Sequence, residues 1–235
     1  HNQQSFRGAG EPRSVRQQDT RCGMTLKLFT ILILCASLSS YAQEAQKEIP
    51  YLMGVKTSEG LLVVVNGSSG HYTFLLTGNE IEHPKPEEDV FIVDNEVVVF
   101  HALSVASLKE EYQTKDSSEI SLLQMHASGE MEYFEKLLSH KLTARYTPFH
   151  LLCGAPALYW HFAAPEDMAA KGIKKQLYVS AIFDDLLLLM NTVQSGAQEE
   201  EELRQFLVSI LNTVRTSART INPYAIADSV KVHAR

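Results

Sequence analysis

The chain has 235 residues, a net charge of −7 and 45% hydrophobic residues, which is a globular composition rather than a disordered or collagen-like one. The acidic balance argues against nucleic-acid binding, because neutralising phosphates requires clustered Lys and Arg. Three cysteines are too few for a dense disulfide framework, and the length suits one domain or two small ones.

The first 42 residues have the pattern of a leader. Residues 1–23 are polar and basic and precede Met24, and we expect them to be an over-extended translation start without ordered structure. Residues 24–42 predict a secretory signal peptide, because a lysine precedes an apolar stretch and small residues precede a cleavage site after Ala42.

Two alternatives to cleavage fit this pattern less well. An uncleaved membrane anchor needs about 20 apolar residues, and the run over 28–38 is shorter. A lipoprotein would be modified at Cys35, but Leu34 stands where a small residue is normal. Cleavage after Ala42 would remove five basic and two acidic residues, leaving a net charge of −10 and Cys153 as the single cysteine. We therefore expect an exported protein, periplasmic or secreted, with no membrane span in its mature form.

The predicted domain, residues 43–219, begins with two hairpins. Apolar and β-branched residues over 61–65 and 71–76 flank a turn rich in Gly and Ser. The apolar runs 90–93 and 97–100 flank a short polar turn in the same way. Both pairs are therefore expected to form antiparallel strands.

A helix is predicted over residues 118–142, because apolar and small residues recur there at steps of three and four and share one face. Asp116 and Glu119 fit a capped start, and Gly129 weakens the middle of the helix. Residues 102–117 carry no pattern that assigns them.

The second half of the domain predicts three more strands. One covers 158–163 and contains the only tryptophan, and two others cover 176–183 and 186–191. Asp184 and Asp185 form a two-residue turn between the last two strands. Both faces of this hairpin are largely apolar, so we expect both faces of the sheet to be covered.

A final helix is predicted from Glu199 to Val214, with one apolar stripe. The acidic run 199–202 lies in its first turns and Arg215 follows its end, which agrees with the helix macrodipole. The acidic run is interpreted as a solvated helix start, with a cation-binding patch as the alternative. Residues 220–235 are expected to form a C-terminal tail.

Strands that form hairpins, rather than alternating one-for-one with helices, predict an α+β fold. We expect a single domain in which an antiparallel sheet carries helices on both faces. No cofactor is expected, because the chain lacks a phosphate loop, a nucleophile elbow, and zinc and calcium motifs. The histidines are scattered at spacings that do not suit a metal site.

One pair of residues suggests an enzyme. Cys153 as nucleophile and His150 as base would make a hydrolase-type site if a third group oriented them. The neighbours of Cys153 are apolar, however, and a free cysteine in such a setting is often a small buried side chain. No catalytic residue is therefore assigned.

A binding site is the other candidate. Strand alternation places Trp160 and Phe162 on one face, where they anchor the core, and Tyr159 and His161 on the other. Tyr159, His161 and Tyr178 combine apolar bodies with polar tips, so we hypothesise that these three residues line a ligand groove.

The segments 154–162, 175–183 and 186–190, followed by the helix to Val214, resemble the end of PsbP/Mog1-like domains. The resemblance covers about 60 residues of the chain and implies a sandwich with helices on both sides of an antiparallel sheet. It contains no functional residue that can be transferred to this chain.

These observations together favour an exported soluble binding or accessory module of the cell envelope. Its expected partner is a protein or a small-molecule ligand, not a nucleic acid. Two alternatives stay open: the hydrolase-type enzyme described above, and an assembly subunit, which would show a large apolar patch or an unpaired sheet edge.

Overall fold

The computed structural model describes residues 51–68, 70–84, 89–114 and 118–226. The expected leader over 1–42 and the helix-start residue Asp116 lie outside the described residues. The strands are β1 (Tyr51–Lys56), β2 (Leu61–Gly67), β3 (Gly70–Leu76), β4 (Ile81–Glu82), β5 (Val90–Val93), β6 (Glu96–Ser104), β7 (Ala144–His150), β8 (Pro156–Ala163), β9 (Ile173–Phe183), β10 (Leu186–Ser195) and β11 (Arg215–Ser217). The helices are α2 (Val105–Glu111), α3 (Glu119–Leu138), α4 (Glu166–Ala169) and α5 (Glu200–Leu211).

The strands form two antiparallel sheets with helices packed on them, which confirms the α+β class. The larger sheet has the order β4-β5-β6-β10-β9-β8-β7, and the smaller has the order β1-β2-β3-β11. The predicted first hairpin is β2–β3, and the structure places it in the smaller sheet because β1 and β11 pair with its two outer edges. The second sheet was not expected from the sequence.

The hairpins β5–β6 and β9–β10 both turn through two residues, and β5–β6 is one residue tighter than the sequence suggested because Glu96 belongs to the strand. In β5–β6, Val93 pairs with Glu96, and the two residues between them, Asp94 and Asn95, have φ values of 48° and 70°. Two consecutive left-handed residues make the type I′ turn that matches strand twist. In β9–β10, Phe183 pairs with Leu186 across the predicted two-residue turn.

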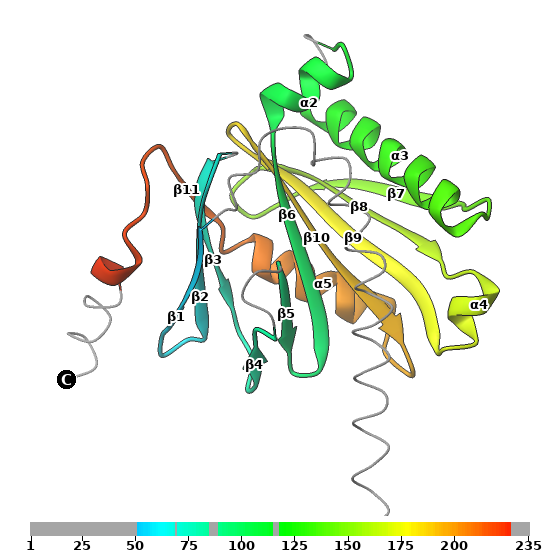
Figure 1. Ribbon diagram of the computed structural model, residues 1–235, viewed down its shortest axis with the longest axis horizontal. Helices are drawn as coiled ribbons and strands as arrows, with labels where there is room; N and C mark the ends of the chain where they lie inside the picture. Colours follow the sequence, from blue (N-terminus) through cyan, green and yellow to red (C-terminus); the bar gives the residue numbers. More distant parts are fainter. Residues whose placement is uncertain (1–50, 69, 85–88, 115–117, 227–235) are drawn as a thin grey trace, which may run out of the picture.

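Helices α2, α3 and α4 cover one face of the larger sheet (Figure 1). Phe134 of α3 is at the centre of this layer, with its ring 5.5 Å from that of Phe162 and 5.9 Å from that of Tyr178. Ser118 caps α3 by accepting a hydrogen bond from the backbone of Ser121. The helix runs unbroken past Gly129, as its bounds show.

Helix α5 and the smaller sheet cover the other face. Phe74 of β3 meets Phe100 of β6 edge to face at 5.0 Å, which joins the two sheets. The apolar stripe of α5 packs into the same layer through Leu203, Leu207, Ile210 and Leu211. The expectation that both faces of the larger sheet are covered is therefore confirmed.

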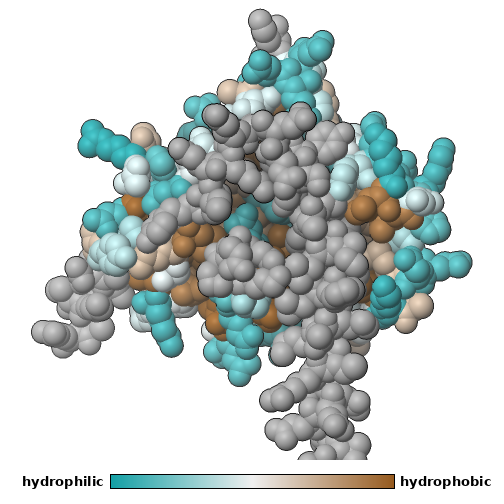
Figure 2. Space-filling view, viewed as in Figure 1, coloured by the Kyte–Doolittle hydropathy of each residue, from teal (hydrophilic) through white to brown (hydrophobic). Residues whose placement is uncertain are grey.

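The two outer strands of the larger sheet are poorly suited to pairing with another chain. Strand β4 has two residues, and β7 contains Pro148, which has no backbone N–H to donate. Figure 2 shows hydrophilic side chains projecting around the rim of one face, with hydrophobic residues in the recesses between them. These features do not favour assembly through the edges of the larger sheet.

The chain beyond residue 219 still contacts the domain. The Asn66 side chain of β2 donates to the Ile221 carbonyl at 2.9 Å and accepts from the Ile221 N–H at 2.9 Å. The structured part therefore extends past the boundary predicted from the sequence, at least to Ile221. None of the helices in the described part of the chain has the length and apolarity to cross a bilayer.

The packing of Phe134 between α3 and the larger sheet can be tested by substitution. Phe134→Ala is expected to reduce the free energy of unfolding by about 3–5 kcal/mol, because it leaves a cavity among closely packed rings. Leu137→Ala on the same helix is the matched control, because Leu137 is 40% exposed and the change should cost less than about 1 kcal/mol. Urea denaturation of both variants measures the difference, and equal losses would contradict this packing.

Candidate functional site

The structure divides the three residues predicted to line a groove. Tyr159 and His161 lie on β8 and face the α5 side of the larger sheet. Tyr178 pairs with Trp160 across β8 and β9, so it faces the α3 side instead. The prediction of one shared groove is wrong because directly opposed residues on neighbouring strands share a face.

Tyr178 is part of the core. Its ring stacks on Trp160 at 3.9 Å with an interplanar angle of 6°, and Trp160 donates from Nε1 to the hydroxyl of Ser180 at 3.1 Å. The core roles predicted for Trp160 and Phe162 are confirmed, since both are buried in the layer under α3. Tyr178 belongs with them rather than with Tyr159.

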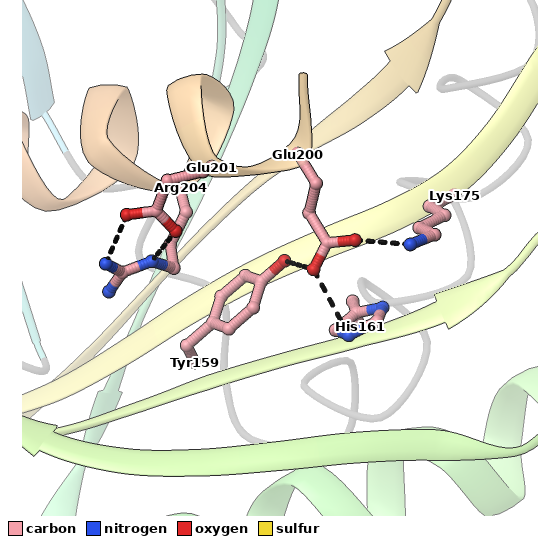
Figure 3. A network of polar contacts seen from close by, with 6 residues as sticks. All are labelled: Tyr159, His161, Lys175, Glu200, Glu201 and Arg204. Carbon is pink, nitrogen blue, oxygen red and sulfur yellow. Dashed lines mark hydrogen bonds and ion pairs between the residues drawn. The ribbon is translucent and has the colours of Figure 1, made fainter. Parts of the chain in front are cut away.

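On the opposite face, Tyr159 and His161 meet the first turn of α5 (Figure 3). Glu200 Oε1 accepts a hydrogen bond from the Tyr159 hydroxyl at 2.9 Å and lies 3.3 Å from His161 Nε2. Its other oxygen, Oε2, binds the ammonium group of Lys175 on β9. We call these four residues, Tyr159, His161, Lys175 and Glu200, the Glu200 network.

Local sequence explains why Glu200 lies there. Three consecutive glutamates occupy the first turn of α5, where unpaired backbone N–H groups favour negative charge. The apolar stripe of α5 faces the sheet and sets its rotation, so the side chain of Glu200 reaches β8 and β9. The acidic run was interpreted as solvated, and this is wrong for Glu200.

A second ion pair borders the network. Arg204 donates to both carboxylate oxygens of Glu201, at 2.7 Å from Nε and 2.5 Å from Nη2. Its guanidinium carbon also lies 5.9 Å from the centre of the Tyr159 ring and 6.0 Å from that of Phe149. The pair therefore holds a cation over the aromatic surface that continues from β8 to β7.

The electrostatics agree with an ionised Glu200. Burial acts to raise the pKa of Glu200, but hydrogen bonds from Lys175 and Tyr159 outweigh it, and the pKa falls below its usual value. Burial and the bond to Glu200 raise the pKa of Tyr159 far above 10. Burial also lowers the pKa of His161; the charge of Glu200 opposes this effect, and those of Lys175 and Arg145 add to it. Tyr159 is thus a neutral donor and Glu200 an anionic acceptor.

The Glu200 network is built to hold structure together. A carboxylate that already receives donors on both oxygens is a weak general base. Its contacts connect α5 with β8 and β9, which are distant in sequence. Strand alternation places Tyr159 and His161 on one face, but no local pattern points to Lys175 or Glu200, because only the packing of α5 across the sheet brings them to that face.

The proposed hydrolase pair is not assembled. Cys153 is exposed in the turn between β7 and β8, so the expectation of a buried cysteine is wrong. No hydrogen bond among the described residues joins Cys153 to His150 or to another base. Within the same residues, no three His, Cys, Asp or Glu side chains are grouped so that they could hold a metal ion.

The energy of the network can be measured with a double-mutant cycle. Tyr159→Phe should reduce the free energy of unfolding by about 1 kcal/mol, because the ring stays packed and only the hydrogen bond is lost. Glu200→Gln should reduce the free energy of unfolding by a similar amount. The double variant should lose less than the sum of the two single losses. Additive losses would show that the Tyr159–Glu200 bond contributes nothing.

The network also predicts a pH dependence. The lowered pKa of Glu200 means that its stabilising effect is present above pH 4.5 and is lost as the pH falls through the lowered pKa. The stability loss caused by Glu200→Gln should therefore be largest near neutral pH and shrink in acid. Thermal unfolding at several pH values measures this, and a constant loss would contradict an ionised Glu200.

No protein-family model matches the chain, and no curated protein matches it. Among solved structures, the chain is similar to the solution structure of cyanobacterial PsbP (CyanoP) from Synechocystis sp. PCC 6803. The identity is 9%, the alignment covers 74% of this chain and 96% of that chain, and the TM-score is 0.41. Neither the fold class nor a function of this chain is argued from a likeness this distant.

Proposed function

We propose that the protein is an exported binding or accessory module of the cell envelope, which contacts its partner through the turn between β7 and β8. The observation that carries this proposal is the exposure of Leu152, which is 92% accessible to solvent. Cys153 beside it is also exposed. We call residues 151–155 the tip turn.

The tip turn is held in place by hydrogen bonds. The N–H of Leu151 donates to the Ala155 carbonyl, and that of Gly154 donates to the Leu151 carbonyl, both at 2.9 Å. The N–H of Leu152 donates to the side chain of Asn212, the C-cap of α5, also at 2.9 Å. Leu151 is buried and anchors the turn in the core.

A single exposed leucine is common on protein surfaces. The tip turn differs because its backbone is fixed to α5, so the Leu152 side chain is held outward at little further entropic cost when a partner binds. Four large apolar residues are exposed in the described part of the chain, and Leu152 is the most exposed of them: Leu137, Tyr146, Leu152 and Tyr224. This arrangement best supports a role in which the partner binds the outward-held side chain of Leu152.

The export part of the proposal rests on the pattern of residues 24–42 in the sequence. The accessory part is supported by the Glu200 network, in which Glu200 contacts Tyr159, His161 and Lys175 and so joins α5 to the larger sheet. The partner is expected to present an apolar pocket, since Leu152 would otherwise gain nothing by leaving water.

Export is tested by expressing the full chain in its native host. The protein should be found in the envelope or the medium, with an intact mass that begins at Gln43. Recovery from the cytoplasm with residues 24–42 still attached would refute the exported role.

Binding through the tip turn is tested by crosslinking. A thiol-reactive photo-crosslinker on Cys153 should give an adduct of defined mass in native envelope extract, and Cys153→Ser should give none. Leu152→Asp should reduce the adduct at least about tenfold, because a charge cannot enter an apolar pocket. Tyr224→Asp is the matched control, since Tyr224 is also exposed, at 64%, and lies on another part of the chain. An equal adduct from the Leu152 variant would exclude the tip turn as the contact.

A further inference from the structure

A group of ionisable side chains lies inside the layer between α3 and the larger sheet. His126 of α3 is only 3% exposed, and its Nε2 lies 3.7 Å from Glu130 Oε1 one turn later. His101 of β6 is close enough to lower the pKa of His126. We call His101, His126 and Glu130 the His–Glu cluster.

The surroundings of the cluster are apolar. His101 pairs with Leu189 of β10, and on α3 His126 lies beside Leu123 and Ala127, all of which belong to the core under α3. Burial lowers the pKa of each histidine to about 4. Burial, and then Glu111, raises the pKa of Glu130 to about 7. In this layer each of the three groups is therefore easiest to bury in its neutral form.

The cluster is also short of hydrogen bonds. Among the described residues, three of its buried atoms have no hydrogen-bond partner: His101 Nε2, His126 Nδ1 and Glu130 Oε2. On the other side of the sheet Glu200 receives donors on both carboxylate oxygens, while His161 Nδ1 of the Glu200 network and His71 Nδ1 of β3 lack a partner among the described residues. Unpaired buried polar groups weaken packing, and the His–Glu cluster brings three of them together under α3.

Few charged groups can compensate a proton taken up by the cluster. Helix α2 carries Lys109, Glu110 and Glu111, and of these Glu111 acts on Glu130. Helix α4 carries Glu166 and Asp167, and Tyr112 and Tyr133 pack against this layer. Strand β6 contributes His101 itself. Strands β9 and β7 contribute Tyr178 and Tyr146 on this face, and β8 and β10 present no ionisable side chain toward α3. Acid therefore places uncompensated positive charge in an apolar layer.

The sign of the pH effect follows from the three pKa shifts. A histidine with a lowered pKa contributes stability that is present above pH 6.5 and is lost as the pH falls toward about 4. Glu130 acts in the opposite sense, losing its contribution as the pH rises from 4.5 to about 7. Between pH 6.5 and 4.5, the loss of stability from the two histidines is larger than the gain from the one carboxyl, so acid destabilises this layer. Asp89, whose pKa burial raises to about 6, also acts in the opposite sense and does not favour opening in acid.

We propose that α2 and α3 form an acid-opened cover over the aromatic face of the larger sheet, released when the imidazoles of the buried His126 and the half-buried His101 take up protons. Opening brings both imidazoles into water, where they hold their protons without penalty. It also uncovers Trp160, Phe162 and Tyr178, which α3 covers at neutral pH. The smaller sheet and α5, on the opposite face, stay folded during this step.

The chain carries its own reporter for this opening. Trp160 is the only tryptophan and lies directly in the layer that α3 covers. Acidification of the full chain from pH 8 to 4 should increase acrylamide quenching of Trp160 fluorescence. Hydrogen exchange should accelerate at the amides of α3 while those of β2 and β3 stay protected. Loss of protection in α3 and in β2 and β3 together would mean global acid unfolding and would overturn the proposal, as would the absence of any pH effect.

Variants identify the groups that respond. On opening between pH 4.5 and 6.5, the two imidazoles take up protons while Glu130 releases one, so the net uptake is about one. His101→Gln and His126→Gln should each reduce that net uptake to about zero and move the opening midpoint down by roughly half a pH unit or more. Glu130→Gln should raise the melting temperature at pH 8, where the wild-type carboxyl must ionise in the core, and leave it unchanged at pH 5. His140→Gln, an exposed histidine beyond the end of α3, is the matched control and should behave as wild type.

Each outcome of the variant series decides the question. Midpoints identical to wild type in both histidine variants exclude the His–Glu cluster as the sensor. If either histidine variant fails to fold at pH 8, as judged by circular dichroism, the comparison between the wild type and Glu130→Gln still applies. Equal melting temperatures of those two proteins at both pH values would also reject the proposal.

Discussion

The structure depends on burial of the β9–β10 hairpin on both faces. Every residue of β10 from Leu186 to Gln194, and of β9 from Gln176 to Ile182, is buried. A sheet with two apolar faces is stable only when each face is covered, which requires two further layers. Helices α2, α3 and α4 supply one layer, and α5 with the smaller sheet supplies the other (Figure 1). The position of every polar group discussed above follows from this sandwich.

The two outer layers are held in different ways. On the α5 side, the anionic Glu200 is satisfied by Tyr159, His161 and Lys175, so polar contacts reinforce the apolar stripe of the helix. On the α3 side, the His–Glu cluster lies in the core with three unpaired atoms. Proteins whose layers differ in this way can open one layer at a time. The proposed tip turn and the proposed acid-opened cover lie on opposite faces of the larger sheet.

Much of the fold could be predicted, because hydrophobic period and turn chemistry are local. The hairpins β2–β3, β5–β6 and β9–β10 and the helices α3 and α5 were all found near their observed places. Strands β1, β4, β7 and β11 and helices α2 and α4 were missed. The burial pattern of β7 is mostly exposed and β11 has three residues, so neither shows the alternation that identifies a strand. Such edge strands form because their backbone hydrogen-bonds to that of a neighbouring strand. Their own side chains carry no pattern that predicts this pairing.

The sequence by itself determined the α+β class, the register of the central hairpin and the core roles of Trp160 and Phe162, since period-two and helical patterns decide which face each residue takes. Only the tertiary structure decided that Tyr178 stacks on Trp160 and that Glu200 joins Tyr159 and Lys175. It also decided that Cys153 is exposed although its sequence neighbours are apolar. Each of these depends on contacts between segments far apart in the chain. Strand pairing and the rotation of α5 set those contacts, and neither is encoded in any short stretch of residues.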